Sequence, residues 1–225
     1  MQPSAHSIFL TGGTGYIGSR LLKLLLGRGH TVTALTRPSS AQKLPPGAIP
    51  VIGDALSSDY LPHVPPCDTF IHLVGASHPS PSKAAEFRSI DLVGLLSAVS
   101  VARSANICHF IYVSVAHPAP VMKAYIEVRE QCEQIIRESG MNGTILRPWY
   151  VLGPGHRWPY ALKPMYWLMG KIPATRADTQ RLGLVTLQQM INTLVLSTEN
   201  PATGIRILEV PAIRNGSFSS ATVAP

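Results

Sequence analysis

The chain has 225 residues, of which 45% are hydrophobic and 14% charged, enough to build one α/β domain with a sizeable core. Its formal charge of +7 comes from scattered Lys and Arg residues without interleaved aromatic rings, which argues against a nucleic-acid-binding surface. Three cysteines without metal-ligand spacing, no signal-peptide pattern and no apolar stretch of bilayer-spanning length predict a reduced, cytoplasmic protein without a metal site or membrane contact.

The first informative motif is a glycine-rich turn near the start of the chain. The apolar segment Ser7–Leu10 predicts a strand, and Ser19–Leu26 predicts a helix. The eight residues between them are Thr11, Gly12, Gly13, Thr14, Gly15, Tyr16, Ile17 and Gly18. Three of the glycines are three residues apart, which permits a tight turn, lets backbone amides approach a diphosphate and packs the helix closely on the strand. We therefore expect a dinucleotide to bind here.

Strand-like and helix-like segments alternate after this first unit. Strands are predicted at 31–36, 49–52, 69–74, 109–114 and 144–146. Helices are predicted at Ala84–Ala105 and Met122–Glu138, the second with a charged face. This order indicates an α/β fold with a doubly wound parallel sheet, a Rossmann fold, whose ligands gather at the carboxyl ends of the strands.

The pattern changes after Pro148. We expect residues 1–210 to form a single domain in which 149–210 make a small C-terminal cap, with a helix from about Thr186 to Ser197 and a strand at 205–210. Residues 211–225 lack periodicity and are expected to be a loose tail. Within the cap, His156 and Trp158 are candidate substrate-pocket residues, although aromatic groups with polar tips also suit a packed core.

Together these segments resemble the extended and atypical branches of the short-chain dehydrogenase/reductase superfamily, of the epimerase/dehydratase-like or NmrA-like kind, over about Ser7 to Val210. The resemblance implies an NAD(P) site in which the turn Thr11 to Gly18 holds the pyrophosphate. By the same resemblance, Asp54 after the third strand contacts the adenine, and Val74 and Gly75 form the ribose edge after the fourth. Arg147 and Pro148 match the segment that precedes the substrate pocket of the family, and by this resemblance they are also expected to contact the cofactor.

The cofactor preference follows from charge at the end of the second strand. An acidic residue there would accept hydrogen bonds from both ribose hydroxyls of NAD, but this chain has Arg37, followed by Ser39 and Ser40. A guanidinium matches a phosphate, so we predict that NADP is favoured over NAD. The alternative is that Arg37 is a surface residue that begins a loop.

Candidate catalytic residues are Tyr125, Arg129 and Ser114. In the superfamily a tyrosine moves the hydroxyl proton and a lysine four residues later holds positive charge beside it, whereas this chain has Arg129 at that position. Asp91 stands where many relatives have asparagine, and Ser114 ends a strand two residues before the usual hydroxyl position. Alternatively, Tyr125 is an ordinary helix residue, Arg129 pairs with Glu133 at i+4, and Ser114 caps a strand.

Two functions remain open at this point. One is an NAD(P)-dependent oxidoreductase, epimerase or dehydratase that acts on a small molecule. The other is a catalytically weak or inactive protein that senses NAD(P) or serves in regulation or assembly. No nucleic-acid partner is expected, and the helices that pair subunits in relatives leave a homodimer open.

Overall fold

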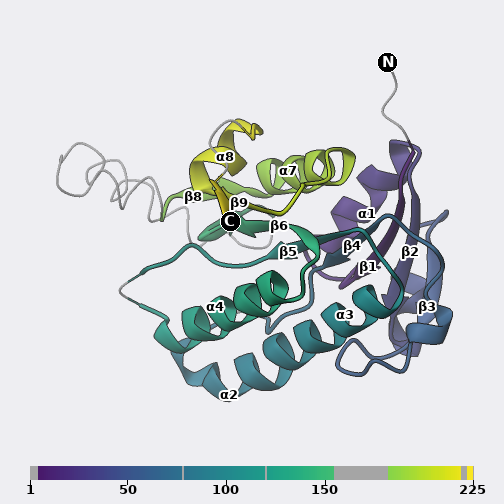
Figure 1. Cartoon of the computed structure of the whole chain (residues 1–225), viewed down its shortest axis with the longest axis horizontal. Coiled ribbons are helices and arrows are strands. Elements are labelled where there is room, and N and C mark those ends of the chain that lie inside the picture. The colour runs from purple at the N-terminus through teal and green to yellow at the C-terminus, as the bar shows by residue number, and fades with distance from the viewer. Residues whose placement is uncertain (1–4, 78, 120, 155–181, 219–221, 225) are drawn as a thin grey trace.

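The computed structural model describes residues 5–77, 79–119, 121–154, 182–218 and 222–224, and its centre is one twisted sheet (Figure 1). In the described part of the chain, eight strands lie in the order β10-β9-β6-β5-β4-β1-β2-β3, and only β10 runs antiparallel to its neighbour. The strands are β1 (Ser7–Thr11), β2 (Thr31–Thr36), β3 (Ile49–Ile52), β4 (Thr69–His72), β5 (His109–Val113), β6 (Asn142–Arg147), β9 (Ile205–Glu209) and β10 (Thr222–Ala224). The predicted doubly wound sheet is confirmed.

Helices cover both faces of the sheet. In Figure 1, α1, α7 and α8 lie on one side of the sheet, and α2, α3 and α4 lie on the other. Their bounds are α1 (Gly18–Gly27), α2 (Ala84–Glu86), α3 (Val93–Ser104), α4 (Lys123–Glu138), α7 (Leu187–Glu199) and α8 (Val210–Asn215). The predicted helix Ala84–Ala105 is observed as α2 and α3, joined by a π-helical turn at Phe87–Leu92.

Two hydrophobic cores hold these layers together. Leu21, Leu22 and Leu25 recur at helical spacing on α1 and pack with α7 in the first core. On the other face, α3 and α4 bury residues such as Leu95 and Val128 against the sheet. Each such side chain contributes roughly 1.5–3 kcal/mol when fully buried, so the two cores fix the strand ends relative to one another.

The region expected to be a cap belongs in large part to the main fold. Helix α7 packs against α1, and β9 joins the sheet beside β6. Outside that sheet, β7 (Tyr150–Leu152) pairs in parallel with β8 (Leu184–Thr186).

The expectation of a loose tail at 211–225 is wrong for its first residues. Helix α8 begins at Val210, and Ala212 and Ile213 are buried in the core shared with α7. Pro211 lies in the first turn, and Gly216 ends the helix in the left-handed conformation. These are ordinary helix start and stop signals, which the short apolar segment between them made easy to overlook.

Candidate dinucleotide and catalytic site

The glycine-rich turn connects β1 to α1 at the carboxyl edge of the sheet. Gly12 has φ +77°, and a side chain there would also meet the backbone of Leu73, which follows β4. The amide of Gly15 donates to the Gly12 carbonyl oxygen at 3.0 Å, which closes the turn. A Cβ on Gly18 would collide with that same carbonyl, so only glycine lets α1 begin this close to the strand.

The start of α1 is open to an anion. Ile17 provides no side-chain cap, and the first turn carries no acidic residue. Backbone amides and the helix dipole therefore present positive charge at this point, which is the donor set that a pyrophosphate requires. Gly13 and Thr14 lie in the same turn, so all eight predicted residues form one continuous segment.

Arg37 follows β2 at the same edge of the sheet. Its side chain is exposed, and among the described residues no carboxylate forms an ion pair with it. Ser39 is exposed next to it, while Ser40 is buried and its amide donates to the Arg37 carbonyl oxygen at 2.9 Å. Asp54 is exposed at the end of β3, where its Oδ1 accepts from the amide of Leu56.

The end of β4 lies beside the turn because β1 and β4 are neighbours in the sheet. Thr11 is in register with His72, and its hydroxyl lies 2.9 Å from His72 Nδ1. Burial, with a further contribution from Arg129, lowers the pKa of His72 to about 3, so this imidazole is neutral at physiological pH. Val74 and Gly75, the predicted ribose edge, follow directly and are half-buried.

Arg129 has different partners from those expected. Its Nη2 lies 2.6 Å from Asp91 Oδ1, and both side chains are buried. Its Nη1 donates to the Tyr112 hydroxyl at 2.8 Å and to the Val113 carbonyl oxygen at 3.0 Å. The alternative pairing of Arg129 with Glu133 at i+4 is therefore wrong: the two unusual residues, Asp91 and Arg129, neutralise each other instead.

Tyr125 lies against this pair. The Arg129 guanidinium carbon is 4.9 Å from the centre of the Tyr125 ring, and the centres of the Phe87 and Tyr125 rings are also 4.9 Å apart. Burial raises the pKa of Tyr125, and the charge of Arg129 offsets part of that shift. Burial alone would lower the pKa of Arg129, but its polar partners outweigh this effect and raise it well above the usual value. Tyr125 is thus a protonated phenol beside a fixed cation.

Ser114 is held by a second buried cluster, one helical turn farther along α4. Its hydroxyl donates to Glu133 Oε1 at 2.6 Å, and Arg147 binds the same carboxylate with Nε at 2.9 Å and Nη2 at 2.5 Å. Arg147 also donates to Glu209 at 2.8 Å. Burial alone would raise the pKa of Glu133, but contacts with His117 and Arg147 outweigh it and lower the pKa to about 2.

The structure thus brings Tyr125 and Arg129 together and gives Ser114 and Arg147 a common partner in Glu133. Sequence reasoning missed Glu133 as the centre of this cluster, although its place one helical turn after Arg129 was visible. Pro148 is buried, and its carbonyl oxygen accepts from the amide of Ala116. The candidate pocket residues His156 and Trp158 lie outside the described residues.

The described residues contain neither a metal centre nor a membrane span. No group of three or more His, Cys, Asp or Glu side chains is arranged to hold a metal ion. None of the described helices combines the length and hydrophobicity that a membrane span requires.

Comparison with known proteins agrees with this geometry. The chain is 29% identical over 168 residues to the 4-hydroxy-2-methyl-3-oxo-4-farnesyl-3,4-dihydroquinoline-1-oxide ketoreductase of Stigmatella aurantiaca, a match that covers 64% of this chain and 50% of the relative. It is 24% identical over 143 residues to the photosystem II assembly factor Ycf39 of Synechocystis, covering 62% of this chain and 43% of the relative. The chain spans about half the length of these curated relatives.

The fold has solved counterparts. The Bordetella bronchiseptica enzyme WbmH in complex with NAD+ superposes with a TM-score of 0.69 at 19% identity, covering 92% of this chain and 76% of that one. Residues 12–161, about two thirds of the chain, match the sequence model of a family described as NAD(P)H-binding. The chain therefore belongs to the NAD(P)H-binding family.

Proposed function

We propose that this chain is an NADP(H)-dependent oxidoreductase that reduces a carbonyl group on a small molecule. The observation that carries the proposal is the open turn at the start of α1 with a cation, Arg37, at the end of the neighbouring strand. The ketoreductase relative supports the reaction class. An epimerase or dehydratase that uses the cofactor transiently would require the same cradle.

The preference for NADP rests on Arg37. In a βαβ unit, the residue at the end of the second strand is next to the adenine ribose, where an acid would repel a 2′-phosphate. The exposed guanidinium of Arg37 has no carboxylate partner among the described residues, so its donors remain available to that phosphate.

Arg37→Ala tests this assignment. Loss of a charge-assisted contact of about 1.5–3 kcal/mol would weaken NADPH binding roughly 10- to 100-fold. NADH, which lacks the phosphate, should bind the native protein and the variant alike. Isothermal titration of both nucleotides measures the ratio of the NADH and NADPH dissociation constants. The matched control is Arg103→Ala, which removes an exposed cation at the end of α3. If Arg37→Ala leaves this ratio of dissociation constants unchanged, Arg37 does not determine a preference for NADP over NAD.

In the proposed reaction, the residues of this chain transfer a proton to the carbonyl oxygen of the substrate. A reduced nicotinamide, when bound, would supply the hydride. The raised pKa of Tyr125 means that its hydroxyl keeps its proton at neutral pH and can act as the acid. After the proton leaves, the phenolate is stabilised by Arg129, which Asp91 and Tyr112 hold in place, until water restores the proton.

Tyr125→Phe removes the proposed acid and leaves the ring packing against Phe87. We expect turnover to fall by about a hundredfold or more, with NADPH affinity unchanged. The measurement is the loss of reduced-nicotinamide absorbance with aldehydes, ketones and quinones as substrates. Equal rates for the native protein and the variant would remove Tyr125 from the mechanism.

Binding without turnover is the second candidate function, and two contacts favour it. The Arg129 guanidinium is engaged by Asp91, and the Ser114 hydroxyl donates to Glu133. A protein that holds the nucleotide in this way could serve in sensing or assembly, as the similarity to Ycf39 illustrates. Tight NADPH binding with no turnover of any carbonyl compound would favour this function over reduction.

A further inference from the structure

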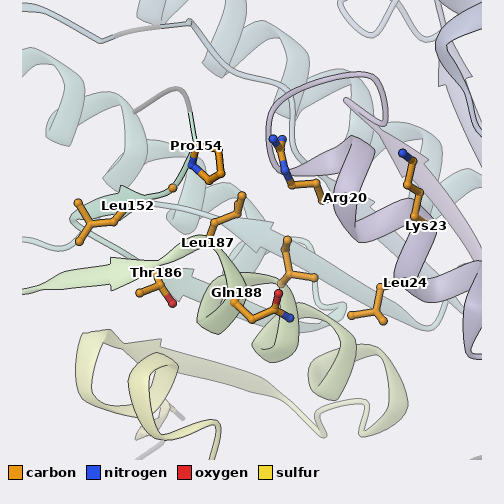
Figure 2. A pocket seen from close by; sticks show the side chains of 10 residues that line it. Arg20, Lys23, Leu24, Leu152, Pro154, Thr186, Leu187 and Gln188 are labelled. Carbon is orange, nitrogen blue, oxygen red and sulfur yellow. The ribbon is translucent and has the colours of Figure 1, made fainter. Parts of the chain in front are cut away.

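A groove lies between the amino-terminal halves of α1 and α7, beside Tyr16 of the glycine-rich turn. Its volume is about 610 Å³, within the range of small-molecule pockets. Figure 2 shows Arg20 and Lys23 projecting from α1 along one wall, with Leu152, Pro154 and Leu187 on the other side. The described residues that line the groove are Arg20, Lys23, Leu24, Leu152, Gly153, Pro154, Thr186, Leu187, Gln188 and Ile191.

The lining combines apolar surface with uncompensated positive charge. The described lining residues include two cations and no acid. Lys23 is exposed and has no ion-pair partner among the described residues. Leu24, which is half-buried, and the exposed Pro154 supply apolar surface, and the largely buried side chains of Leu187 and Ile191 also line the groove. A ligand that is complementary to this groove carries an anionic head on an apolar body.

Arg20 is already fixed in position. Its Nη1 donates to the Tyr16 carbonyl oxygen at 2.8 Å, and its guanidinium carbon lies 4.8 Å from the centre of the Tyr16 ring. Only part of the guanidinium is used by these contacts, and the remaining N–H groups can bind an oxyanion. A preordered cation loses less conformational entropy when a ligand binds.

The start of α7 adds to the positive potential. Thr186 and Gln189 form a capping box, in which the Thr186 hydroxyl accepts from the Gln189 amide at 3.1 Å. Helix geometry leaves the amides of Leu187 and Gln188 without an intrahelical acceptor, and the first turn of α7 contains no acid. At their carboxyl-terminal ends the two helices are joined by the Arg28–Glu199 ion pair. The groove therefore lies only between their amino-terminal halves.

We propose that this groove is a second ligand site, adjoining the dinucleotide cradle at Tyr16, for an amphipathic anion with a carboxylate or phosphate head and an apolar tail. Arg20 and Lys23 bind the head, and the leucine and isoleucine side chains cover the tail. A carboxylate and a phosphate both present anionic oxygen atoms to these cations. Their measured affinities for the groove distinguish the two head groups.

Isothermal titration with decanoate and with decyl phosphate, below the concentrations at which they form micelles, tests the proposal. We expect saturable one-to-one binding of at least one of them, and the tighter ligand identifies the head group. Decanol, which lacks the charge, and acetate, which lacks the tail, should each bind at least about tenfold more weakly.

Three variants localise the binding. Arg20→Gln should raise the dissociation constant by about tenfold or more. Gln188→Trp should do the same by filling the groove while both cations remain, because Gln188 is an exposed lining residue. Arg103→Gln on α3, on the other face of the sheet, should leave binding unchanged.

Three results would contradict a ligand site in this groove. Absence of binding of both anions at millimolar concentration, or equal affinity of decanol, excludes an amphipathic anion as the occupant. Equal effects of Arg20→Gln and Arg103→Gln exclude this groove as the site. A change in oligomeric state with Gln188→Trp, measured by light scattering, would assign the groove to contact between copies of the chain and also overturn the proposal.

Discussion

Asp91 and Arg129 show that two departures from a family pattern can form one interaction. Each looked like the loss of a functional residue when considered alone, asparagine in one case and lysine in the other. Here Asp91 Oδ1 and Arg129 Nη2 are 2.6 Å apart, so the two side chains form a buried ion pair. A buried cation without its counter-ion is costly, so neither residue can change independently. Tyr125 therefore has a cation beside it, but one whose place is fixed by Asp91.

A double-mutant cycle measures this dependence. Asp91→Asn should lower the free energy of unfolding by about 3–5 kcal/mol, because Arg129 remains buried without its counter-charge. Arg129→Lys in the Asp91→Asn background restores the residues typical of the family and should recover part of the loss. Urea unfolding of the native protein, of each single variant (Asp91→Asn and Arg129→Lys) and of the double variant gives the four free energies of the cycle. The control is Glu138→Gln, an exposed acid on α4 that accepts only from the Gln134 side chain among the described contacts, and it should cost no more than about 1 kcal/mol. Strict additivity of the two substitutions would show that the residues do not interact.

At the scale of elements, α4 connects the sheet edge to the proposed acid. Residues four apart on a helix share a face, and here Arg129 and Glu133 both point inward. Arg129 reaches the end of β5 and the turn before α3, while Glu133 reaches Arg147 at the end of β6. Arg147 in turn binds Glu209 at the end of β9. Two side chains of one helix thus bind the ends of β5 and β6, and Arg147 extends this network to the end of β9.

The Glu133 cluster predicts an acid-sensitive part of the stability. The pKa of Glu133 is about 2 in the folded chain and near 4.3 in the unfolded chain. The ionised carboxylate therefore stabilises the fold fully above about pH 4.3. This contribution, on the order of 3 kcal/mol, is lost as pH falls from there toward 2. Urea unfolding of the native protein and Glu133→Gln between pH 7 and pH 3 measures it. The difference between the two proteins should shrink toward acid pH, and a constant difference would contradict this role.

For the whole molecule, local patterns predicted the architecture but not the side-chain partners. Hydrophobic periodicity and the spacing of Gly12, Gly15 and Gly18 depend on near neighbours, so the parallel sheet and the turn could be inferred from them. The partners of Arg129 and Ser114 depend on the approach of strand ends far apart in sequence, which periodicity does not encode. Helix α7 was predicted, but its packing beside α1, and the groove between them, required the tertiary structure.

The central claim is that the turn at the start of α1 binds the diphosphate of NADPH. Gly15 is exposed in that turn, so Gly15→Val adds bulk where the phosphates would lie. Circular dichroism checks that the variant is folded. Isothermal titration of purified, nucleotide-free protein should give saturable NADPH binding that Gly15→Val weakens by about tenfold or more. Absence of binding of both NADPH and NADH to the native protein at millimolar concentration would contradict the claim.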